Sequence, residues 1–394
     1  MRIGLDLRPL QKTSRYRGIG SYLSNLVIEL SAADHENEYI YYSLKNKNKI
    51  HLLEHSLKRW KEYPLYRPKR PERLHWMWDS LFLATTLNND NIDIFHAQEI
   101  TSCPTGILPK KCKTVITVHD MIPFIFWDRY KHAHTFDYRF ALKRSLRLLS
   151  RADMIIAPSK ATKNDILKFI DFPHESVKVI YEGVSQVFSP MDKLKAKEIM
   201  KKEYGMDGNY ILYIGGADFR KNLHNLLLGY SRSLENHGIK HNLVLAGEVF
   251  ERSHLNDVKT IQHLVQKLNI ENHVKIPGFI PEHHLSCLYS GASLFIMPSL
   301  YEGFGLSVLE SMACGTPVVT SSVSSLPEVC GNAAFLINPH DVEEISNAID
   351  IVLNDMKTKN SLIQRGLEQA RQFNWTKTAR ETLAVYKELA QRGQ

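Results

Sequence analysis

Two glutamates eight positions apart, Glu302 and Glu310, flank a stretch with the strongest chemical signal in the sequence. Gly303 and Gly305 lie between them, just after the apolar run Leu294–Met297. Glycines at the start of a helix leave backbone N–H groups open to an anionic, hydroxyl-rich ligand. A carboxylate about one and a half turns further into the helix can accept hydrogen bonds from vicinal hydroxyls. The spacing therefore predicts a binding loop for such a ligand.

A second polar stretch begins at Gly215, directly after the apolar run Tyr210–Ile214. Gly215 and Gly216 let the backbone approach a ligand closely. Arg220 and Lys221 then stand at the mouth of the next helical pattern, where two cations can neutralise a diphosphate. Taken alone, this stretch is more typical of a simple turn before a solvated helix.

Short apolar runs alternate with helical patterns along the whole chain. This alternation is typical of βαβ units and parallel sheets, in which ligands bind beyond the carboxyl ends of the strands. The expected strands are 2–7, 92–96, 113–119, 154–157, 177–181, 210–214, 242–246, 274–276, 294–297, 317–320 and 334–337. The expected helices are 20–32, 77–88, 136–150, 160–170, 222–235, 255–268, 305–313 and 341–354.

The series of strands restarts after a loop-like stretch at 183–190. We therefore predict an α/β protein with two doubly wound, Rossmann-like domains, at 1–185 and 190–372. A chain of 394 residues is long enough for two such domains. One more amphipathic helix is predicted over 375–391.

The net charge of +8 is unevenly placed. Residues 1–185 hold 29 Lys and Arg against 20 Asp and Glu, whereas the remainder holds 21 against 22. A one-sided basic surface suggests an anionic partner, although it also serves solubility. No nucleic-acid-binding module accompanies the charge, so no nucleic-acid partner is expected.

The five cysteines are scattered and include no C-x-x-C pair, which favours a reducing compartment. The 18 histidines show no metal-ligand spacing, and we expect neither a metal nor a cofactor. The first residues are typical of a strand rather than a signal peptide. No apolar stretch approaches the ~20 residues that cross a bilayer. We expect a cytoplasmic protein, at most peripheral at the inner face of the membrane.

The stretch that ends at Glu310 resembles the E-x7-E motif of glycosyltransferase family 4. The turn at Gly215 with Arg220 and Lys221 resembles the diphosphate-binding turn of the family. The stretches 245–247 (LAG) and 313–319 (ACGTPVV) resemble its nucleotide-pocket and A-x-G-x-P-V-V motifs. The resemblance covers nearly the whole chain. It implies retaining enzymes of GT-B fold, with two Rossmann-like domains that face each other across a cleft.

The resemblance also implies roles for individual residues. Arg220 and Lys221 would bind the donor diphosphate and Glu310 the ribose. Glu302, with the backbone of 304–306, would bind sugar hydroxyls and phosphate. The helix 375–391 would cross back to the first domain. The donor-binding residues so implied are Gly18, Gly20, Gly215, Gly216, Arg220, Lys221, Gly247, Phe304, Gly305, Leu306 and Glu310. The catalytic residues so implied are His119, Asp120, Arg220, Lys221 and Glu302.

In the first domain, His119 and Asp120 follow an expected strand. They resemble the His-Asp pair of mannosyltransferase-like members, whose histidine contacts the donor sugar. A histidine there can donate to a hydroxyl or stabilise developing charge. Seen alone, the pair is more typical of a histidine capped by its neighbour in a loop.

Gly18 and Gly20 open the first helical pattern and resemble the glycine-rich turn of the family, which lies against donor phosphates and acceptor. They are not a dinucleotide fingerprint, because position 23 is Leu. We expect the preceding Arg8, Arg15 and Arg17 to form a basic loop over an anionic acceptor.

The stretch 57–73 holds seven basic and two acidic residues with interleaved aromatic residues, and Trp76 and Trp78 follow. Prolines at 64, 68 and 71 predict a loop rather than a helix. Such a loop either contacts a bilayer interface or grips phosphates, and is equally typical of an ordinary surface loop. We expect peripheral membrane contact, if any, through 57–78.

Together these features predict a retaining hexosyltransferase. It would move mannose, as the first choice, from a GDP- or UDP-type sugar to a polysaccharide or to an anionic or lipid-linked glycan. Glucose, galactose or an N-acetylhexosamine from a UDP-sugar is the alternative donor. A non-catalytic nucleotide-binding scaffold of the same fold is the alternative from another class, although intact Glu302, Glu310, Arg220 and Lys221 argue against it.

Overall fold

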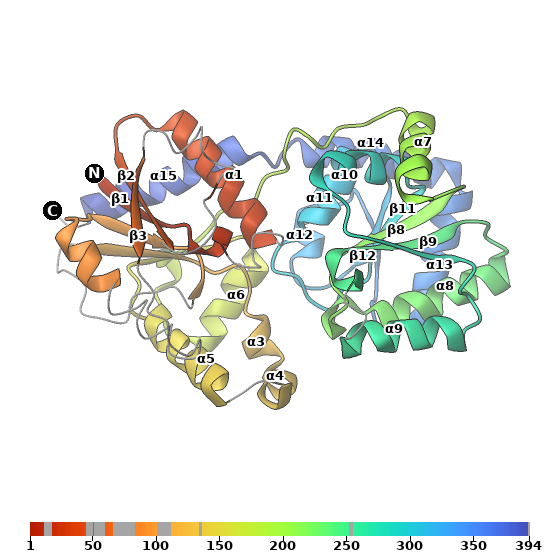
Figure 1. Cartoon of the computed structure of the whole chain (residues 1–394), viewed down its shortest axis with the longest axis horizontal. Helices are drawn as coiled ribbons and strands as arrows, with labels where there is room; N and C mark the ends of the chain where they lie inside the picture. Colours follow the sequence, from red (N-terminus) through yellow and green to blue (C-terminus); the bar gives the residue numbers. More distant parts are fainter. Residues whose placement is uncertain are drawn as a thin grey trace. The chain divides into compact units, whose positions relative to one another are not determined.

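The computed structural model describes residues 1–11, 18–44, 50, 60–65, 83–100, 112–133, 136–251 and 255–392. The chain divides into two compact units, Met1–Gly183 with Asn374–Gln394, and Val184–Phe373. Each unit holds one parallel sheet with helices on both faces (Figure 1). The predicted α/β class with two doubly wound sheets is therefore confirmed.

The sheet of the first unit has seven parallel strands in the order β3-β2-β1-β4-β5-β6-β7. Its central strands are buried along their whole length, as expected for a parallel sheet covered on both faces. The strands are β1 (Arg2–Asp6), β2 (Glu38–Leu44), β3 (Lys61–Leu65), β4 (Ile94–Ala97), β5 (Lys113–Thr117), β6 (Met154–Ala157) and β7 (Val177–Val179).

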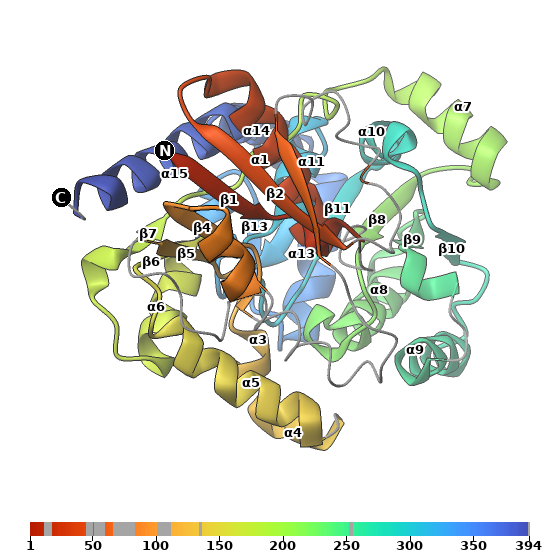
Figure 2. The same cartoon turned by 60° about the vertical axis from the view of Figure 1, so that its left-hand side comes forward.

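One face of this sheet is covered by α1 (Gly18–Ala33) and α15 (Trp375–Gln391), which pack against each other. The other face carries α5 (Phe136–Leu149) and α6 (Lys160–Phe169), as Figures 1 and 2 show. The hydroxyl of Thr378 in α15 donates to the carbonyl oxygen of Tyr181 at 2.7 Å. Shorter elements are η1 (Arg8–Gln11), α3 (Ile122–Ile125), α4 (Trp127–Ala133) and η7 (His174–Ser176).

The second unit has a six-stranded parallel sheet in the order β10-β9-β8-β11-β12-β13. Its strands are β8 (Tyr210–Ile214), β9 (Asn242–Ala246), β10 (Val274–Gly278), β11 (Leu294–Met297), β12 (Val318–Ser321) and β13 (Phe335–Ile337). Every one of them begins or ends within about two residues of its prediction, because most of these strands are short apolar runs next to turn residues.

Helices α8 (Leu223–His237), α9 (Asn256–Lys267) and α13 (Val342–Asn354) cover one face of that sheet. The other face carries α10 (Glu282–Gly291), α11 (Leu306–Ala313) and α14 (Met356–Ala370) (Figure 1). The remaining elements are α7 (Lys193–Tyr204), η8 (Phe219–Lys221), η9 (Glu248–Glu251) and α12 (Leu326–Cys330).

The prediction of a loop over 57–73 is wrong for Lys61–Leu65, which form the edge strand β3. Pro64 fits there because an edge strand has one side without a ladder partner for the missing N–H. Trp60 is only 8% exposed and stacks on Tyr39 with ring centroids 4.5 Å apart. It is therefore packed within the unit and not offered to a membrane. The rest of 57–73, with Trp76 and Trp78, lies outside the described residues.

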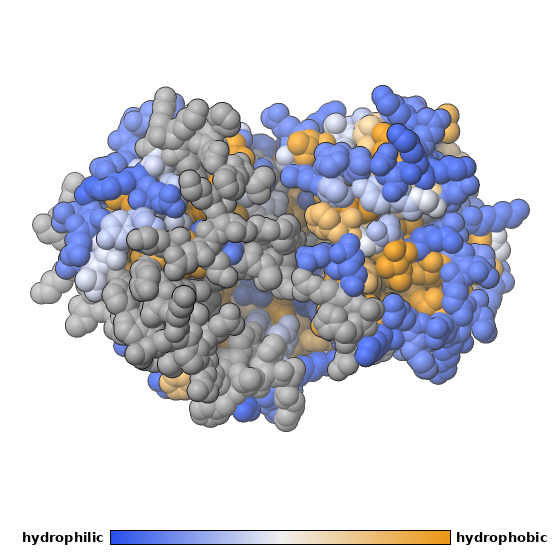
Figure 3. Space-filling model, viewed as in Figure 1, coloured by the Kyte–Doolittle hydropathy of each residue, from blue (hydrophilic) through white to orange (hydrophobic). Residues whose placement is uncertain are grey.

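The part of the chain that the structure describes contains no helix long and apolar enough to cross a membrane. In Figure 3, hydrophilic side chains cover most of the visible periphery of the second unit, with smaller apolar areas between them. Scattered apolar areas of this kind are normal for a folded surface.

Candidate active site

A cluster of charged side chains lies where β8 and β11 end. These strands are hydrogen-bonded neighbours, so their carboxyl ends lie at the same edge of the sheet. The backbone N–H of Leu300 donates to the carbonyl oxygen of Arg220 at 2.7 Å, which joins the two loops that follow the strands. Residues 80 positions apart in sequence are thus held side by side.

Two cations and two carboxylates form a closed ion cluster at this edge. The guanidinium of Arg220 lies 3.1 Å from Glu302 through Nη1 and 2.9 Å from Asp218 through Nε. The ammonium of Lys221 lies 2.6 Å from the other Glu302 oxygen. The four formal charges cancel. A diphosphate that binds here would therefore add negative charge to a cluster that is already neutral.

The charges of the cluster fix the ionisation of Glu302. Burial by itself raises the pKa of this carboxyl, but the nearby Lys221 and Arg220 outweigh it and lower the pKa to about 2. Glu302 is therefore anionic at any physiological pH. The prediction that Glu302 binds sugar hydroxyls remains a prediction, while the observed partners of its carboxylate are the two cations.

Two serines after β12 hold the backbone of the Glu302 loop. The hydroxyl of Ser324 accepts from the Glu302 N–H at 3.0 Å, and that of Ser325 donates to the carbonyl oxygens of Glu302 and Phe304 at 2.9 and 2.7 Å. Ser325 is fully buried. The loop is thus anchored by the segment that follows the neighbouring strand.

Gly305 is the residue that turns this loop into α11. Its φ of 120° is a conformation that side chains rarely adopt, and a Cβ there would lie 2.9 Å from the side chain of Leu326. The helix begins directly afterwards at Leu306, so its first N–H groups point out of the loop end. Phe304 is buried beside it and contacts the ring of Phe373. The backbone geometry suits the anion-binding role predicted for 304–306.

Glu310 lies further along α11 and accepts a hydrogen bond from the hydroxyl of Tyr289 in α10 at 2.7 Å. Tyr289 is completely buried, and burial together with the nearby Glu310 raises its pKa well above the usual value. It therefore always donates. This contact fixes the direction of the carboxylate for which a ribose-binding role is predicted.

The turn after β8 approaches the end of β9 very closely. Tyr213 donates from its hydroxyl to the carbonyl oxygen of Gly216 at 2.6 Å, and the Gly215 N–H donates to Ala246 at 3.1 Å. A Cβ on Gly247 would collide with the carbonyl oxygen of Gly215. Gly215 and Gly247, two of the predicted donor-binding glycines, thus have a packing reason to be glycine.

In the first unit, His119 lies just beyond β5 with its Nδ1 3.7 Å from the buried carboxyl of Glu182. The edge of its ring meets Tyr22 of α1, with centroids 4.8 Å apart. Its Nε2 is buried and has no hydrogen-bond partner among the described residues. Asp120 instead accepts from the N–H of Ile122 at 3.0 Å, at the start of α3. Of the predicted His119–Asp120 pair, the histidine thus has a ring nitrogen, Nε2, for which the described residues supply no hydrogen bond.

A buried polar chain lies behind His119. His96 of β4 contacts the hydroxyl of Tyr386 in α15 at 2.6 Å through Nδ1 and that of Thr117 at 2.7 Å through Nε2. Thr117 lies 3.4 Å from the hydroxyl of Tyr22. Burial lowers the pKa of His96 to about 3, with a contribution from His119, so the ring is neutral at pH 7. This series of hydrogen-bonded side chains is therefore a fixed, uncharged support.

The expected basic loop at Arg8 is not observed at that residue. Arg8 is buried, and its guanidinium pairs with both carboxylate oxygens of Asp6, at 2.7 and 2.9 Å. A bidentate, desolvated pair of this kind is held in place and does not reach for a ligand. Arg15 and Arg17 lie outside the described residues. Gly18 is exposed, with open space where a Cβ would lie, and Gly20 is buried in α1.

Comparison with known proteins decides the family. Two family models match, glycosyl transferases group 1 over residues 195–369 and glycosyltransferase family 4 over residues 16–186. O-antigen chain mannosyltransferase B of Escherichia coli is 32% identical over 285 residues, which cover 72% of this chain and 73% of that relative. The chain belongs to glycosyltransferase family 4.

Other matches extend this result for the glycosyltransferase. The serotype-specific mannosyltransferase WbdA of Escherichia coli is 30% identical over 302 residues, but the match spans only 36% of the length of WbdA. The crystal structure of HepE from Anabaena in complex with UDP and glucose matches with a TM-score of 0.78 at 17% identity, over 98% of this chain and 100% of HepE. That likeness shows the fold of GT-B glycosyltransferases. The predicted family and fold are confirmed.

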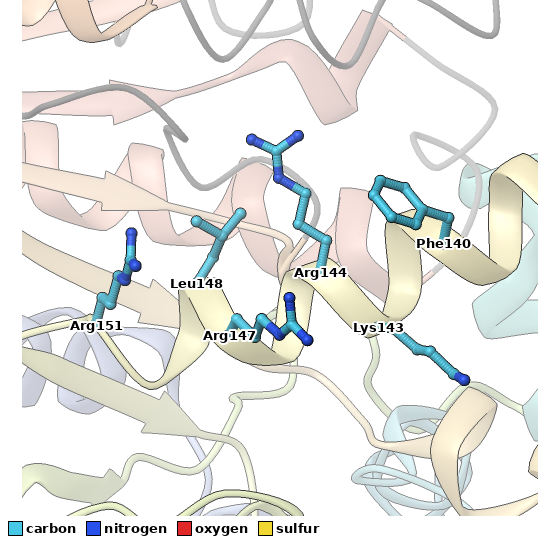
Figure 4. Close-up of a pocket in the computed structure, with 6 residues that line it drawn as sticks. All are labelled: Phe140, Lys143, Arg144, Arg147, Leu148 and Arg151. Carbon is cyan, nitrogen blue, oxygen red and sulfur yellow. The ribbon is translucent and has the colours of Figure 1, made fainter.

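The first unit of the glycosyltransferase also carries a basic hollow of about 340 Å³ along α5. Four of its six lining residues are cations: Lys143, Arg144, Arg147 and Arg151. Phe140, Arg144 and Leu148 point to one side of the helix and Lys143 and Arg147 to another (Figure 4). Phe140 is 52% exposed. The excess positive charge of the first half thus includes a patch with an apolar side chain in it.

The predicted site residues fall into one group in each unit. Asp218 and the predicted Arg220, Lys221 and Glu302 meet in the second unit, and His119 stands in the first. No group of three or more His, Cys, Asp and Glu side chains is arranged to hold a metal ion in the described ranges of the glycosyltransferase.

Sequence reasoning missed the partners of these residues: Tyr289, Ser324, Ser325 and Glu182. The only advance signal was that Ser324 and Ser325 directly follow an expected strand, where ligand-side residues of parallel sheets are found.

Proposed function

We propose that this glycosyltransferase is a retaining hexosyltransferase that moves mannose from a nucleoside diphosphate sugar to a polysaccharide or lipid-linked glycan. The observation that carries the proposal is the Arg220–Lys221–Glu302 cluster at the adjoining ends of β8 and β11. Two largely buried cations contact the loop that leads into α11, and both the cations and the start of a helix attract a diphosphate. The names of the relatives, O-antigen chain mannosyltransferase B and WbdA, support mannose and a glycan acceptor.

In the proposed reaction, the bond between C1 of the sugar and the diphosphate oxygen breaks, and the acceptor hydroxyl forms the new bond to C1 from the same face. A diphosphate oxygen takes the proton of that hydroxyl. Arg220 and Lys221 stabilise the negative charge that builds up on the leaving group. Glu302 releases its hold on them when the diphosphate binds and keeps them in place when it is absent. The protein positions the two substrates and supplies positive charge, and no enzymic nucleophile is required.

The test is a comparison of nucleotides and donors with the purified chain. Thermal unfolding with GDP, UDP and ADP should identify the base, because a ligand of the folded state raises its apparent stability. GDP-mannose and UDP-glucose are then compared in a nucleotide-release assay with methyl α-mannoside as acceptor. Proton NMR of the product should show retained α configuration. Inverted product would overturn the retaining mechanism, and release from UDP-glucose alone would replace mannose by glucose.

Nucleotide binding without any transfer would instead favour the non-catalytic scaffold. Lys221→Ala serves as the internal control, since it removes a cation from the cluster. If wild type and Lys221→Ala release nucleotide equally, the cluster is not the site of transfer.

We also propose that the protein, as a cytoplasmic enzyme, reaches a lipid-linked acceptor at the inner face of the membrane, with the α5 patch as the contact. Each cation near an anionic surface contributes about 1 kcal/mol, and Phe140 can enter the interface. Vesicles that contain phosphatidylglycerol should retain the wild type and release the double variant Lys143→Glu, Arg147→Glu. Equal binding of both proteins would exclude α5 as the contact.

A further inference from the structure

Gln98 is the first residue after β4, in the middle of the seven-stranded sheet of the first unit. β4 lies between β1 and β5, and its last residue, Ala97, is in register with Ile116 of β5. Gln98 therefore stands at the carboxyl edge of the sheet, where doubly wound proteins bind their ligands. Its side chain is completely buried.

Both polar atoms of the Gln98 side chain lack a hydrogen-bond partner within the described part of the protein. A buried amide that has lost its water and gained no partner destabilises the folded state, so such groups are rare and need an explanation. The residues around it do not show this deficit. His96, two positions earlier, has both ring nitrogens bonded, and Arg8 and Asp6 bond each other.

A second orphaned atom lies at the same edge of the sheet. His119 follows β5, the strand next to β4, and its Nε2 is buried without a partner among the described residues. The other ring nitrogen of His119 faces Glu182, and its ring edge meets Tyr22. Two adjoining strand ends thus present three polar atoms whose hydrogen bonds the described residues do not supply.

The chemistry of these atoms selects the ligand. The amide of Gln98 has an N–H₂ group that donates and an oxygen that accepts. A phosphate or carboxylate would satisfy only the N–H₂ group, and a cation only the oxygen. A hydroxyl both donates and accepts, so a pair of sugar hydroxyls satisfies both ends of the amide. Neither end carries a charge, which fits a neutral sugar.

We propose that the Gln98 amide binds sugar hydroxyls, together with Nε2 of His119, and selects which sugar the enzyme accepts. This inference rests on the proposed glycosyl transfer and adds a specificity residue to it. A site built to bond a hydroxyl rejects an analogue that lacks it, because its own buried groups then stay unpaired. The unpaired amide of Gln98 thus destabilises the free protein and gains its hydrogen bonds when the sugar binds.

The decisive variant is Gln98→Met, which keeps the length of the side chain and removes its hydrogen-bonding atoms. The matched control is Gln369→Met in the second unit, where the amide donates to the carbonyl oxygen of Val329 at 2.8 Å. We expect Gln98→Met to unfold at the same or a higher temperature than wild type and to lose roughly 10- to 100-fold in kcat/KM. Gln369→Met should unfold at a lower temperature and keep kcat/KM within about twofold.

Two measurements show whether Gln98 binds the donor sugar or the acceptor sugar. If Gln98 contacts the donor, the variant loses the extra thermal stabilisation that GDP-mannose or UDP-glucose gives over GDP or UDP alone, and the donor KM rises. If it contacts the acceptor, that stabilisation is kept and the KM for methyl α-mannoside rises. Either result supports the proposal.

Unchanged kcat/KM and KM values in Gln98→Met would overturn the proposal. So would a drop in unfolding temperature as large as that of the control, or failure to fold, because the amide would then have an internal partner. A wild type that transfers no sugar would instead overturn the proposed function. In that case, loss of the stabilisation by GDP-mannose or UDP-glucose in Gln98→Met still decides whether Gln98 binds hydroxyls.

Discussion

The two polar groups of this glycosyltransferase differ in how completely they are paired. In the second unit, Arg220, Lys221 and Glu302 satisfy one another, and the carboxylate carries a low pKa as a result. In the first unit, Gln98 and Nε2 of His119 have no partner in the described ranges. One group is already paired through its own charges. The other is incomplete until a ligand arrives, so the two should respond to substitution in opposite ways.

The largest effect is expected from Lys221→Ala. Loss of one cation beside the leaving diphosphate should lower kcat/KM roughly 100- to 1,000-fold, since a preorganised charge is worth most at the transition state. Steady-state nucleotide release measures it. Arg232→Ala is the control, because Arg232 pairs with Glu343 at 3.0 Å on the surface and should change kcat/KM less than twofold. A Lys221→Ala enzyme within tenfold of wild type would contradict the assignment.

Glu302→Gln should cost stability in a pH-dependent way. The pKa of Glu302 is lowered to about 2 from 4.5, so its stabilising contribution is present above pH 4.5 and is lost as pH falls from 4.5 towards 2. At pH 7 the variant should lose about 2–3 kcal/mol in the free energy of unfolding. Urea unfolding at pH 7, 4 and 3 should show the gap to wild type narrowing at the two lower pH values. A gap that stays constant would mean that the ion cluster does not supply the stability.

Tyr289→Phe tests whether the hydrogen bond from the Tyr289 hydroxyl orients the carboxylate of Glu310. Removal of one hydroxyl keeps the buried ring and releases the carboxylate, so nucleotide affinity should fall about 3- to 10-fold. Isothermal titration with the nucleotide found by the screen measures it. Tyr204→Phe removes an equivalent hydroxyl bond, to His284 at 2.7 Å, and should leave affinity unchanged. Equal affinities for all three proteins would separate Glu310 from nucleotide binding.

The smallest effect is expected from Glu182→Gln, with the opposite sign to Glu302→Gln. Burial raises the pKa of Glu182, although His119 lowers it. A raised carboxyl pKa weakens the fold as pH rises from 4.5 through the folded value, so this cost is fully present above both values. The variant should therefore be at least as stable as wild type at pH 7. A marked loss in urea unfolding would show that the first unit depends on this charge.

The sequence predicts the central strands and the motif residues because both carry their signal locally. Leu294–Met297 is a continuous apolar run that ends at proline, and Glu302 and Glu310 have a recognisable spacing. β3 escaped prediction because an edge strand tolerates charges and a proline. Tyr289 and Ser325 escaped because they act through contacts about 20 residues away in the chain. Gln98 carries no motif at all, and only its burial without a partner draws notice.

The placement of α15 has a consequence for the order of events during synthesis. The chain leaves the first unit at Gly183 and returns to it at Asn374, so the ribosome makes the whole second unit in between. Until Tyr386 emerges, His96 lacks one of its two partners and α1 lacks the helix that packs against it. The second unit, a single continuous segment, can fold without waiting. The part of the protein that begins first is therefore finished last.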